Sequence, residues 1–503
     1  MAQQRRVQVA IIGAGMSGLC MAATLEDAGI DSYTVFEQAD EVGGTWRDNT
    51  YPGLTCDVPS RYYTYSFRPN PDWSHFLPPG REIQAYFRQV ADERGIRRHI
   101  RFGTAVTSAR YDDGRWWLTT ADGEEAFDVL VTAAGVLRVP RYPEILGRES
   151  FAGPAFHSSR WDHSVSLPDK RIGLIGTGST GTQIIAELGG TVRGLTVFQR
   201  TAQWVFPVPN PRYSALGRAA LHRFPALNRI GYRFWGWSFR FLFCRAVVQP
   251  GLRRRVLSSI CRWNLRLSVR DPVLRAKLTP DYQPLCKRQV MAGHFYRAVR
   301  QPGVEVVTDP IDHIEPRGIV TADGTLRELD LLVYATGFDA RAYVRPMQIV
   351  GPGGLTLDQA WADGPRAYRS VAVAGFPNLF MLMGPHSPIG NNSLIPVAEA
   401  QAGYALWWIQ EMRAGRVVAA TPTLAATDEY NQSMKAAMPS TIWVSGCSSW
   451  YLGKDGLPEL FPWVPERHTE LLRHPEPADF DICWSGASEP AVSGEPNAAD
   501  RRT

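Results

Sequence analysis

The sequence predicts an α/β chain in which one parallel-sheet unit occurs twice, with the second copy inserted in the first. Two glycine-rich turns of the form G-x-G-x-x-G support this prediction, at residues 13–18 and 176–181. Each turn follows a short apolar run and leads into a helix-compatible stretch that closes in glycine. A second repeated pair, residues 127–135 and 329–337, is typical of a buried strand that ends in small residues. Together these repeats predict two Rossmann-like dinucleotide-binding domains.

The order of these signals predicts the domain boundaries. A chain of 503 residues is longer than one hydrophobic core usually spans. We expect residues 1–140 and 326–483 to form the two parts of the first domain, 141–170 a linker, 171–325 the second domain with a helical insertion at 205–280, and 484–503 a disordered tail.

Composition excludes several classes of protein. Hydrophobic residues are 44% and charged residues 20%, which is an ordinary globular balance. The seven cysteines are odd in number and never form a C-x-x-C pair, which argues against a disulfide framework, a zinc ribbon or a dithiol centre and suits a reducing compartment. We predict no metal site. The start of the chain leaves no room for a signal peptide, and prolines and glycines interrupt the best apolar stretch, 370–398. These features predict a soluble cytoplasmic protein.

The first glycine turn has the context of an adenine-dinucleotide site. Its first glycine allows a tight bend, its second lets the backbone approach a pyrophosphate, and its third lets helix and strand pack closely. The next strand ends at Glu37, roughly 20 residues after the last glycine. A carboxylate there accepts hydrogen bonds from ribose hydroxyls and repels a 2′-phosphate. The site therefore favours FAD or NAD over NADP, with the candidate residues Gly13, Gly15, Met16, Gly18 and Glu37.

The second turn predicts a different nucleotide. Its following strand ends at Arg200 and Thr201, where the first unit has its acid. A guanidinium group matches a 2′-phosphate and so selects NADP over NAD. One chain with both kinds of site is typical of a flavoprotein that takes electrons from NADPH. The candidate residues of this turn are Gly176, Thr177, Gly178, Ser179, Thr180 and Gly181.

Residues 43–67 carry G-G-T-W, Y-P-G-L-T-C-D and Y-T-Y-S-F, which resemble the flavin-pocket segment of the class B flavin monooxygenases. Residues 151–162 fill every fixed position of F-x-G-x-x-x-H-x-x-x-W-[P/D], which resembles the fingerprint of one group of these enzymes, the Baeyer–Villiger monooxygenases. Residues 286–288, Cys-Lys-Arg, resemble the family's Lys-Arg pair, and residues 332–340 resemble its A-T-G segment. One departure is that Arg-Asp-Asn-Thr follows the tryptophan where the family often has Tyr-Trp-Asn-Arg, which leaves the substrate range open.

The resemblance implies the cofactors and the reaction. FAD would occupy the first domain and NADPH the second. NADPH would reduce FAD, O₂ would add to give a C4a-peroxyflavin, and one oxygen atom would be inserted next to a ketone carbonyl to give an ester or lactone. Arg288 would supply the cation that the peroxide anion needs, since arginine does not lose its proton. Asp57 would orient that arginine.

The remaining residue roles also rest on the resemblance. Lys287 would hold the NADP 2′-phosphate together with Arg200 and Thr201, and Trp450 would cover the nicotinamide ribose, although a core position for this tryptophan stays open. We interpret His157 as structural and Trp161 as a packing anchor. The other candidates for the flavin pocket are Gly44, Thr45, Trp46, Tyr63 and Val106.

An alternative reaction stays open: a flavin-containing monooxygenase that oxygenates nitrogen or sulfur would use the same cofactors. Trp161, Asp162 and Arg288 favour the ketone reaction. The absence of C-x-x-C opposes a disulfide reductase, and a non-catalytic nucleotide sensor would not explain Asp57 and Arg288 together. The ketone and the oligomeric state stay open.

Residues 212–277 hold fourteen arginines and one lysine against one acid, with aromatics gathered at 232–243. We interpret this segment as a solvated basic face whose aromatics pack on the second domain. A peripheral contact with an anionic membrane surface is the alternative. No nucleic-acid partner is expected, because no recognised binding module accompanies the charge.

Overall fold

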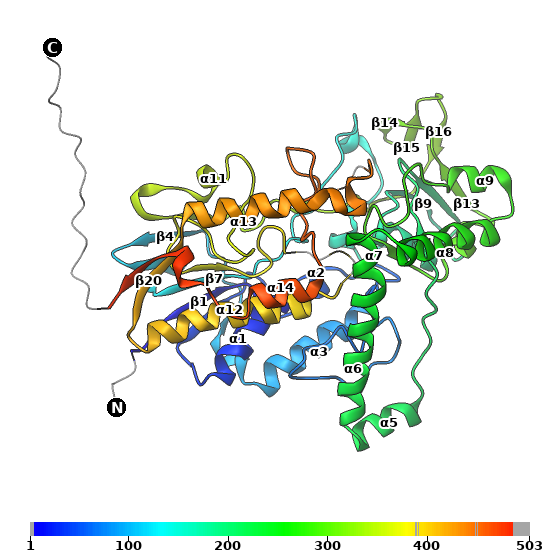
Figure 1. Cartoon of the computed structure of the whole chain (residues 1–503). Coiled ribbons are helices and arrows are strands. Elements are labelled where there is room, and N and C mark those ends of the chain that lie inside the picture. Colours follow the sequence, from blue (N-terminus) through cyan, green and yellow to red (C-terminus); the bar gives the residue numbers. More distant parts are fainter. Residues whose placement is uncertain (1–4, 388–389, 391, 448, 450, 486–503) are drawn as a thin grey trace, which may run out of the picture.

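The computed structural model describes residues 5–387, 390, 392–447, 449 and 451–485, and two parallel sheets organise them (Figure 1). The first sheet has the order β19-β7-β1-β2-β3, with β1 Val9–Ile12, β2 Tyr33–Phe36, β3 Ile100–Arg101, β7 Val129–Thr132 and β19 Leu379–Met381. The second has the order β13-β10-β9-β17-β8, with β8 Ala155–His157, β9 Arg171–Ile175, β10 Gly194–Phe198, β13 Val304–Val307 and β17 Leu331–Tyr334. Their strands are nearly continuous apolar runs because both faces of each sheet are covered.

The two sheets repeat one local arrangement, which confirms the predicted α/β fold class. In the first, β1 leads through α1 (Met16–Asp27) to β2, and in the second, β9 leads through α4 (Ser179–Leu188) to β10. β7 pairs in parallel with β1 just as β17 pairs with β9. The repeated segments 127–135 and 329–337 therefore occupy equivalent positions in the two copies.

The domain boundaries differ from those expected. β17 lies in the second sheet although residues from 326 were expected in the first domain, and β8 adds an edge strand from the expected linker 141–170. Each repeated strand pairs within its own copy of the unit, so the chain returns to the first sheet only with β19. Trp484 ends strand β21 (Phe480–Trp484), which pairs with β20 (Val417–Pro422). The rest of the expected tail, apart from Ser485, lies outside the described residues.

Helices and small sheets cover the first sheet. On one side α12 (Ile395–Arg413) packs against α1, and α3 (Gly80–Glu93) lies beside them. On the other side a four-stranded sheet buries Trp116 and Leu118 against Phe36 and Leu130 of the first sheet. That sheet is formed by β4 Ser108–Asp112, β5 Arg115–Thr120, β6 Gly123–Phe127 and β18 Gln348–Val350.

The remaining strands and helices lie outside the three sheets described above. The strands are β11 Val205–Phe206, β12 Val290–Met291, β14 Ile311–Glu315, β15 Gly318–Thr321 and β16 Leu326–Glu328. The helices are α2 Thr45–Asp48, α10 Phe295–Ala298, α11 Leu357–Ala360, α13 Leu424–Ala437 and α14 Pro465–Leu471. Within the described residues, no helix has both the length and the apolar character needed to cross a membrane.

The predicted helical insertion is present, in green at the right of Figure 1, but its aromatic residues pack elsewhere than expected. Tyr232 and Phe239 contact Tyr62, and Trp235 contacts Phe76, so the inner face of α6 rests on the first domain rather than the second. Gly236 permits this close packing, because a Cβ atom there would lie 2.8 Å from the ring of Tyr62. The insertion comprises α5 Ala215–Arg223, α6 Ala226–Phe239, a π-helical turn Arg240–Cys244, α7 Arg245–Val248, α8 Leu252–Ser268 and α9 Pro272–Lys277.

Candidate active site

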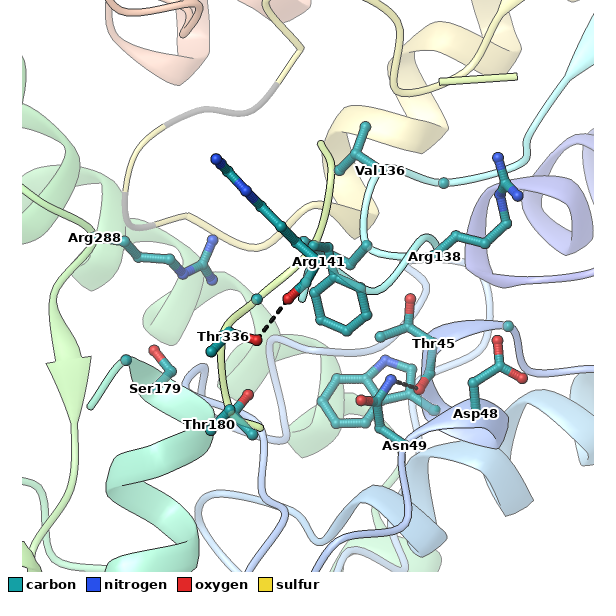
Figure 2. Close-up of a pocket in the computed structure, with 18 of the residues that line it drawn as sticks. Thr45, Asp48, Asn49, Val136, Arg138, Arg141, Ser179, Thr180, Arg288 and Thr336 are labelled. Atoms are coloured by element: carbon teal, nitrogen blue, oxygen red, sulfur yellow. Dashed lines mark hydrogen bonds between the residues drawn. The ribbon is translucent and has the colours of Figure 1, made fainter. Parts of the chain in front are cut away.

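The carboxyl ends of strands from both sheets open on one cavity of about 1560 Å³. Residues after β1, β2 and β7 line it from the first sheet, and residues after β9, β10 and β17 line it from the second. Ligands of doubly wound sheets bind at this edge. The volume exceeds the roughly 300–1,000 Å³ of an ordinary small-molecule pocket, so it offers room for two large ligands. Figure 2 shows Ser179, Thr180 and Arg288 on one side of the cavity and Thr45 and Asn49 on another.

The first glycine turn, residues 13–18, forms a loop at the wall of the cavity, and we call this loop the first cradle. Gly13 has φ +102°, a conformation that side-chain-bearing residues rarely adopt. A Cβ atom on Gly18 would collide with the carbonyl oxygen of Gly13, so Gly18 lies behind the cavity wall at the helix–strand contact. α1 starts after Gly15, which directs its first amide groups toward the cavity. Met16 also lines the cavity.

Glu37 lies at the end of β2 and is 4% exposed. Its two carboxylate oxygens accept hydrogen bonds from the amides of Ala14 (2.8 Å) and Ala39 (3.0 Å). The guanidinium of Arg47 lies 3.0 Å from it, a partner that the sequence did not reveal. The amide of Ala14 ties the carboxylate to the glycine turn, so the two predicted features of this nucleotide site lie side by side.

The second glycine turn repeats this construction. Gly176 has φ +109°, and a Cβ atom on Gly181 would strike the carbonyl oxygen of Gly176. α4 starts at Ser179, directly after Gly178. The hydroxyl of Thr177 donates to the carbonyl oxygen of Thr201 (2.8 Å), which joins the turn to the end of β10. Gly181 lies behind the wall, whereas the other predicted residues of the turn line the cavity: Gly176, Thr177, Gly178, Ser179 and Thr180.

Arg200 and Lys287 reach the same part of the cavity from different loops. Burial lowers the pKa of Lys287; the carboxylate of Asp281 opposes that effect, and the positive charge of Arg200 adds to it. The two cations are therefore close enough to repel each other. Two neighbouring cations fit a phosphate group.

Arg288 and Asp57 form an ion pair on the wall of the cavity. The arginine Nε lies 3.0 Å and Nη2 lies 3.1 Å from the two carboxylate oxygens, so the contact is bidentate. The side chains are 33% and 20% exposed. The Asp57 carboxylate raises the pKa of Arg288, and this effect outweighs desolvation, which acts in the opposite direction. The guanidinium therefore stays charged at every working pH and is held in one orientation.

The flavin-pocket candidates form one wall. Thr45 and Trp46 begin the short helix α2, and the indole Nε1 of Trp46 donates to the hydroxyl of Tyr63 (2.9 Å). Gly44 packs against Gly15 of the first turn, because a Cβ atom on Gly44 would lie 3.1 Å from the Gly15 Cα. All of these residues and Val106 line the cavity. Trp450 lies outside the described residues.

A bridge between the domains was not predicted. The hydroxyl of Tyr51 donates to Oε1 of Gln183 on α4 (2.9 Å), and Nε2 of Gln183 donates to the carbonyl oxygen of Thr55 (2.9 Å). Gly53 permits the close approach, since a Cβ atom there would lie 2.7 Å from the Gln183 carbonyl oxygen. The bridge fixes the loop that ends in Asp57. The loop itself could be recognised by its motif, but its partner lies too far along the chain to be identified from spacing.

The fingerprint residues have structural positions, as interpreted from the sequence. His157 is fully buried, and its Nδ1 accepts from the amide of Ser159 (3.2 Å) while Nε2 lies 3.0 Å from the carbonyl oxygen of Gly337. Nε2 therefore carries the proton. Burial lowers the pKa of His157 to about 4. Trp161 is 8% exposed and packs edge-on against Phe156 (5.1 Å between ring centroids).

One disulfide corrects the interpretation of the cysteines. Cys286 and Cys447 are bonded to each other, and the other five cysteines, all within the described residues, form no disulfide. The two are separated by 161 residues, so spacing carried no sign of the pairing. Cys286 directly precedes Lys287, and its carbonyl oxygen accepts a hydrogen bond from the hydroxyl of Tyr451 (2.6 Å). The loop that carries the Lys-Arg pair is thus tied to the segment around residue 447.

The residues present fit two dinucleotides. The N-termini of α1 and α4 face one cavity, as do Gly13 and Gly176 with their positive φ angles. The first nucleotide site ends in the carboxylate of Glu37, and the second ends in the neighbouring cations Arg200 and Lys287. These features define the class: a flavoprotein linked to a nicotinamide cofactor.

Comparison with known proteins gives the family. A profile of the flavin-binding monooxygenase-like family matches residues 6–213. The chain is 53% identical to an uncharacterized monooxygenase of Mycobacterium tuberculosis, covering 94% of this chain and 96% of that protein. It is 38% identical to a Baeyer–Villiger monooxygenase of Streptomyces coelicolor, covering 90% and 87%. The crystal structure of cyclohexanone monooxygenase from Rhodococcus sp. Phi1 bound to NADP⁺ aligns with a TM-score of 0.83 at 30% identity, covering 95% and 99%.

The chain belongs to the flavin-binding monooxygenase-like family and, within it, to the Baeyer–Villiger monooxygenases. It is an NADPH-dependent flavoprotein monooxygenase whose cofactors are FAD and NADPH. The roles of the individual residues in binding these cofactors stay predictions.

Proposed function

We propose that the protein inserts one oxygen atom of O₂ next to a ketone carbonyl, giving an ester or lactone and consuming NADPH. The observation that carries this proposal is the bidentate Arg288–Asp57 pair on the wall of the cavity between the two cradles. The peroxyflavin route that the family resemblance implies, and a cytoplasmic location, are parts of the same proposal.

Bound FAD would accept hydride from NADPH and activate O₂. A nucleophilic peroxide needs a positive charge beside it that does not donate a proton. Arg288 meets this need because Asp57 raises its pKa further above the working range. Asp57 holds the planar group by two hydrogen bonds, so the charge is placed before the reaction begins.

The cavity also offers a place for an apolar ketone. Met383, Leu394, Trp443 and Leu460 contribute apolar side chains to its lining. An apolar wall that excludes water would favour attack on a carbonyl over loss of the oxidant as H₂O₂. We therefore expect hydrophobic ketones rather than charged ones, without a choice between cyclic, aryl and aliphatic substrates.

A substrate panel tests the proposal. The purified holoenzyme is given NADPH, O₂ and cyclic, aryl or aliphatic ketones, with thioethers and tertiary amines in parallel, and products are identified by mass spectrometry. We expect esters or lactones in proportion to the NADPH consumed. Oxidation of the thioether or amine with no ester from any ketone would instead support the alternative of nitrogen or sulfur oxygenation.

A further inference from the structure

The helical insertion exposes an unusual share of large apolar side chains. Among the described residues, nineteen large hydrophobic side chains are exposed, and twelve of them lie between Leu216 and Val273. Single exposed apolar residues are ordinary, but a gathering on one segment marks an interaction surface. We propose that the outer side of α6 and α8 binds an anionic membrane surface.

The first half of this surface is a stripe along α6. Leu227, Ile230, Phe234 and Trp237 are 43%, 61%, 53% and 55% exposed. Their spacing of three, four and three residues places them on one face of the helix. The opposite face, which includes Tyr232, packs on the first domain. The helix is therefore apolar on both sides, and its outer side has no protein cover in the described structure.

The second half is a stripe along α8. Leu252, Val256, Trp263 and Leu267 are exposed, and they follow one another at intervals of four, seven and four residues. The inner side of α8 buries Cys261 and Leu265 in the core of the second domain. We call the two stripes together the outer face of the insertion.

Contacts at the junction join the stripes. The rings of Trp237 and Phe241 stack at 5.2 Å, and the guanidinium of Arg253, at the start of α8, lies 4.0 Å from the centroid of the Phe241 ring. Figure 1 shows α6 and α8 in the right-hand half of the molecule. The apolar side chains thus form one surface that turns from one helix to the next.

The positive charge of the outer face indicates which partner it binds. Exposed arginines flank both stripes, Arg229 and Arg233 on α6 and Arg255, Arg262 and Arg266 on α8. Residues 212–277 contain a single acid. A second copy of the chain, docked through the same surface, would place arginine against arginine. Anionic lipid headgroups complement the arginines, and the acyl boundary accepts the leucine, phenylalanine and tryptophan side chains.

The inner side of α6 is separated from the lining of the cavity by a single residue, Tyr62. The inner face of α6 contacts Tyr62, whose hydroxyl donates to Oδ1 of Asn392 (2.9 Å), a residue of the cavity lining. A membrane-bound enzyme would therefore hold its cavity near a lipid phase in which apolar ketones dissolve. This last step rests on the proposed function, whereas lipid binding itself does not.

The test is flotation of the full-chain holoenzyme with vesicles, without turnover. Phosphatidylcholine vesicles with and without phosphatidylglycerol are compared at low and high salt. We expect flotation with the anionic vesicles at low salt, a loss at high salt and none with phosphatidylcholine alone. Protein that stays in the bottom fraction with all vesicles would overturn the proposal.

Matched variants locate the binding surface. Trp263→Ser and Leu267→Ser should each lower the floated fraction at least about threefold. Trp484→Ser and Leu146→Ser remove exposed residues of the same types outside the insertion and should leave it unchanged. Equal flotation of both sets would refute the outer face as the site. A concentration-dependent dimer that Trp263→Ser abolishes would refute the lipid assignment in favour of a second copy. NADPH consumption with a water-soluble ketone, measured separately, reports on the proposed function.

Discussion

Arg288 donates two hydrogen bonds to the carboxylate of Asp57, although the two residues are 231 positions apart in the sequence. One partner comes from the loop after α2 and the other from the chain that returns after the helical insertion. The Tyr51–Gln183 bridge fixes the loop of Asp57, and the disulfide of Cys286 ties down the loop of Arg288. Both loops are therefore held at the place where the two domains meet, and the position of the positive charge in the site depends on that arrangement.

Replacement of the arginine tests its charge. Arg288→Met should lower ester formation by roughly 10²–10³-fold, the usual effect of removing one group that stabilises a developing anion. NADPH consumption should continue, with H₂O₂ as its product, because the cradles are intact. The measurement is the ratio of ester to H₂O₂ per NADPH. Arg288→Lys keeps a positive charge but loses the bidentate guanidinium, so its ratio of ester to H₂O₂ should lie between those of the parent enzyme and Arg288→Met. A full ester yield from Arg288→Met would contradict the role assigned to Arg288.

Replacement of the aspartate tests positioning. Asp57→Asn keeps the shape of the side chain and removes its charge, so Arg288 loses its orienting partner. We expect ester formation to fall roughly tenfold while the KM for NADPH stays within about twofold. Steady-state kinetics on ketone and NADPH separate these effects. Asp72→Asn, an exposed carboxylate on the surface, is the control and should behave like the parent enzyme.

Cofactor choice should depend on the two neighbouring cations. Arg200→Gln removes a charged partner of the 2′-phosphate and should raise the KM for NADPH roughly 10- to 100-fold, with little change for NADH. Lys287→Gln should act in the same direction. Flavin absorbance of the purified variants is the control, since the first cradle is untouched. An equal loss with both nicotinamide cofactors would place the phosphate elsewhere.

Counting the thiols of the protein tests the Cys286–Cys447 disulfide directly. In denaturant without a reductant, the protein should present five titratable thiols, those of Cys20, Cys56, Cys244, Cys261 and Cys483. After reduction it should present seven. A thiol reagent under both conditions checks the two numbers, with Cys447→Ser as the reference that shows six in each. Seven thiols before reduction would show that Cys286 and Cys447 are not paired.

The buried fingerprint histidine predicts how stability responds to pH. Burial lowers the pKa of His157 from its ordinary value near 6.5 to about 4, so between these values the unfolded chain binds a proton that the folded chain does not. Its contribution to stability is therefore complete above pH 6.5 and is lost as the pH falls toward 4. His157→Asn should flatten the dependence of Tm on pH in this window, although its Tm at pH 7 is lower. Parallel curves for variant and parent would contradict this.

Local pattern predicted most of the fold and the nucleotide sites. Glu37 and Arg200 each follow the last glycine of their turn by about 20 residues, so their spacing in the sequence predicted the two sites. The assignment of β17 to the second sheet could not be predicted. Its pairing partners lie far away in the sequence, and the apolar run of β17 is compatible with either sheet. The Cys286–Cys447 bond and the Tyr51–Gln183 bridge join segments far apart in sequence and leave no local sign. The exposure of Trp237 and Trp263 depends on which side of each helix the domains cover.

The most direct measurement uses labelled oxygen. The holoenzyme is incubated with NADPH and an apolar cyclic ketone under ¹⁸O₂, and the product is examined by mass spectrometry. We predict a lactone that carries one ¹⁸O atom, formed in proportion to the NADPH oxidised. Recovery of unchanged ketone, with all of the label in H₂O₂, would contradict the account.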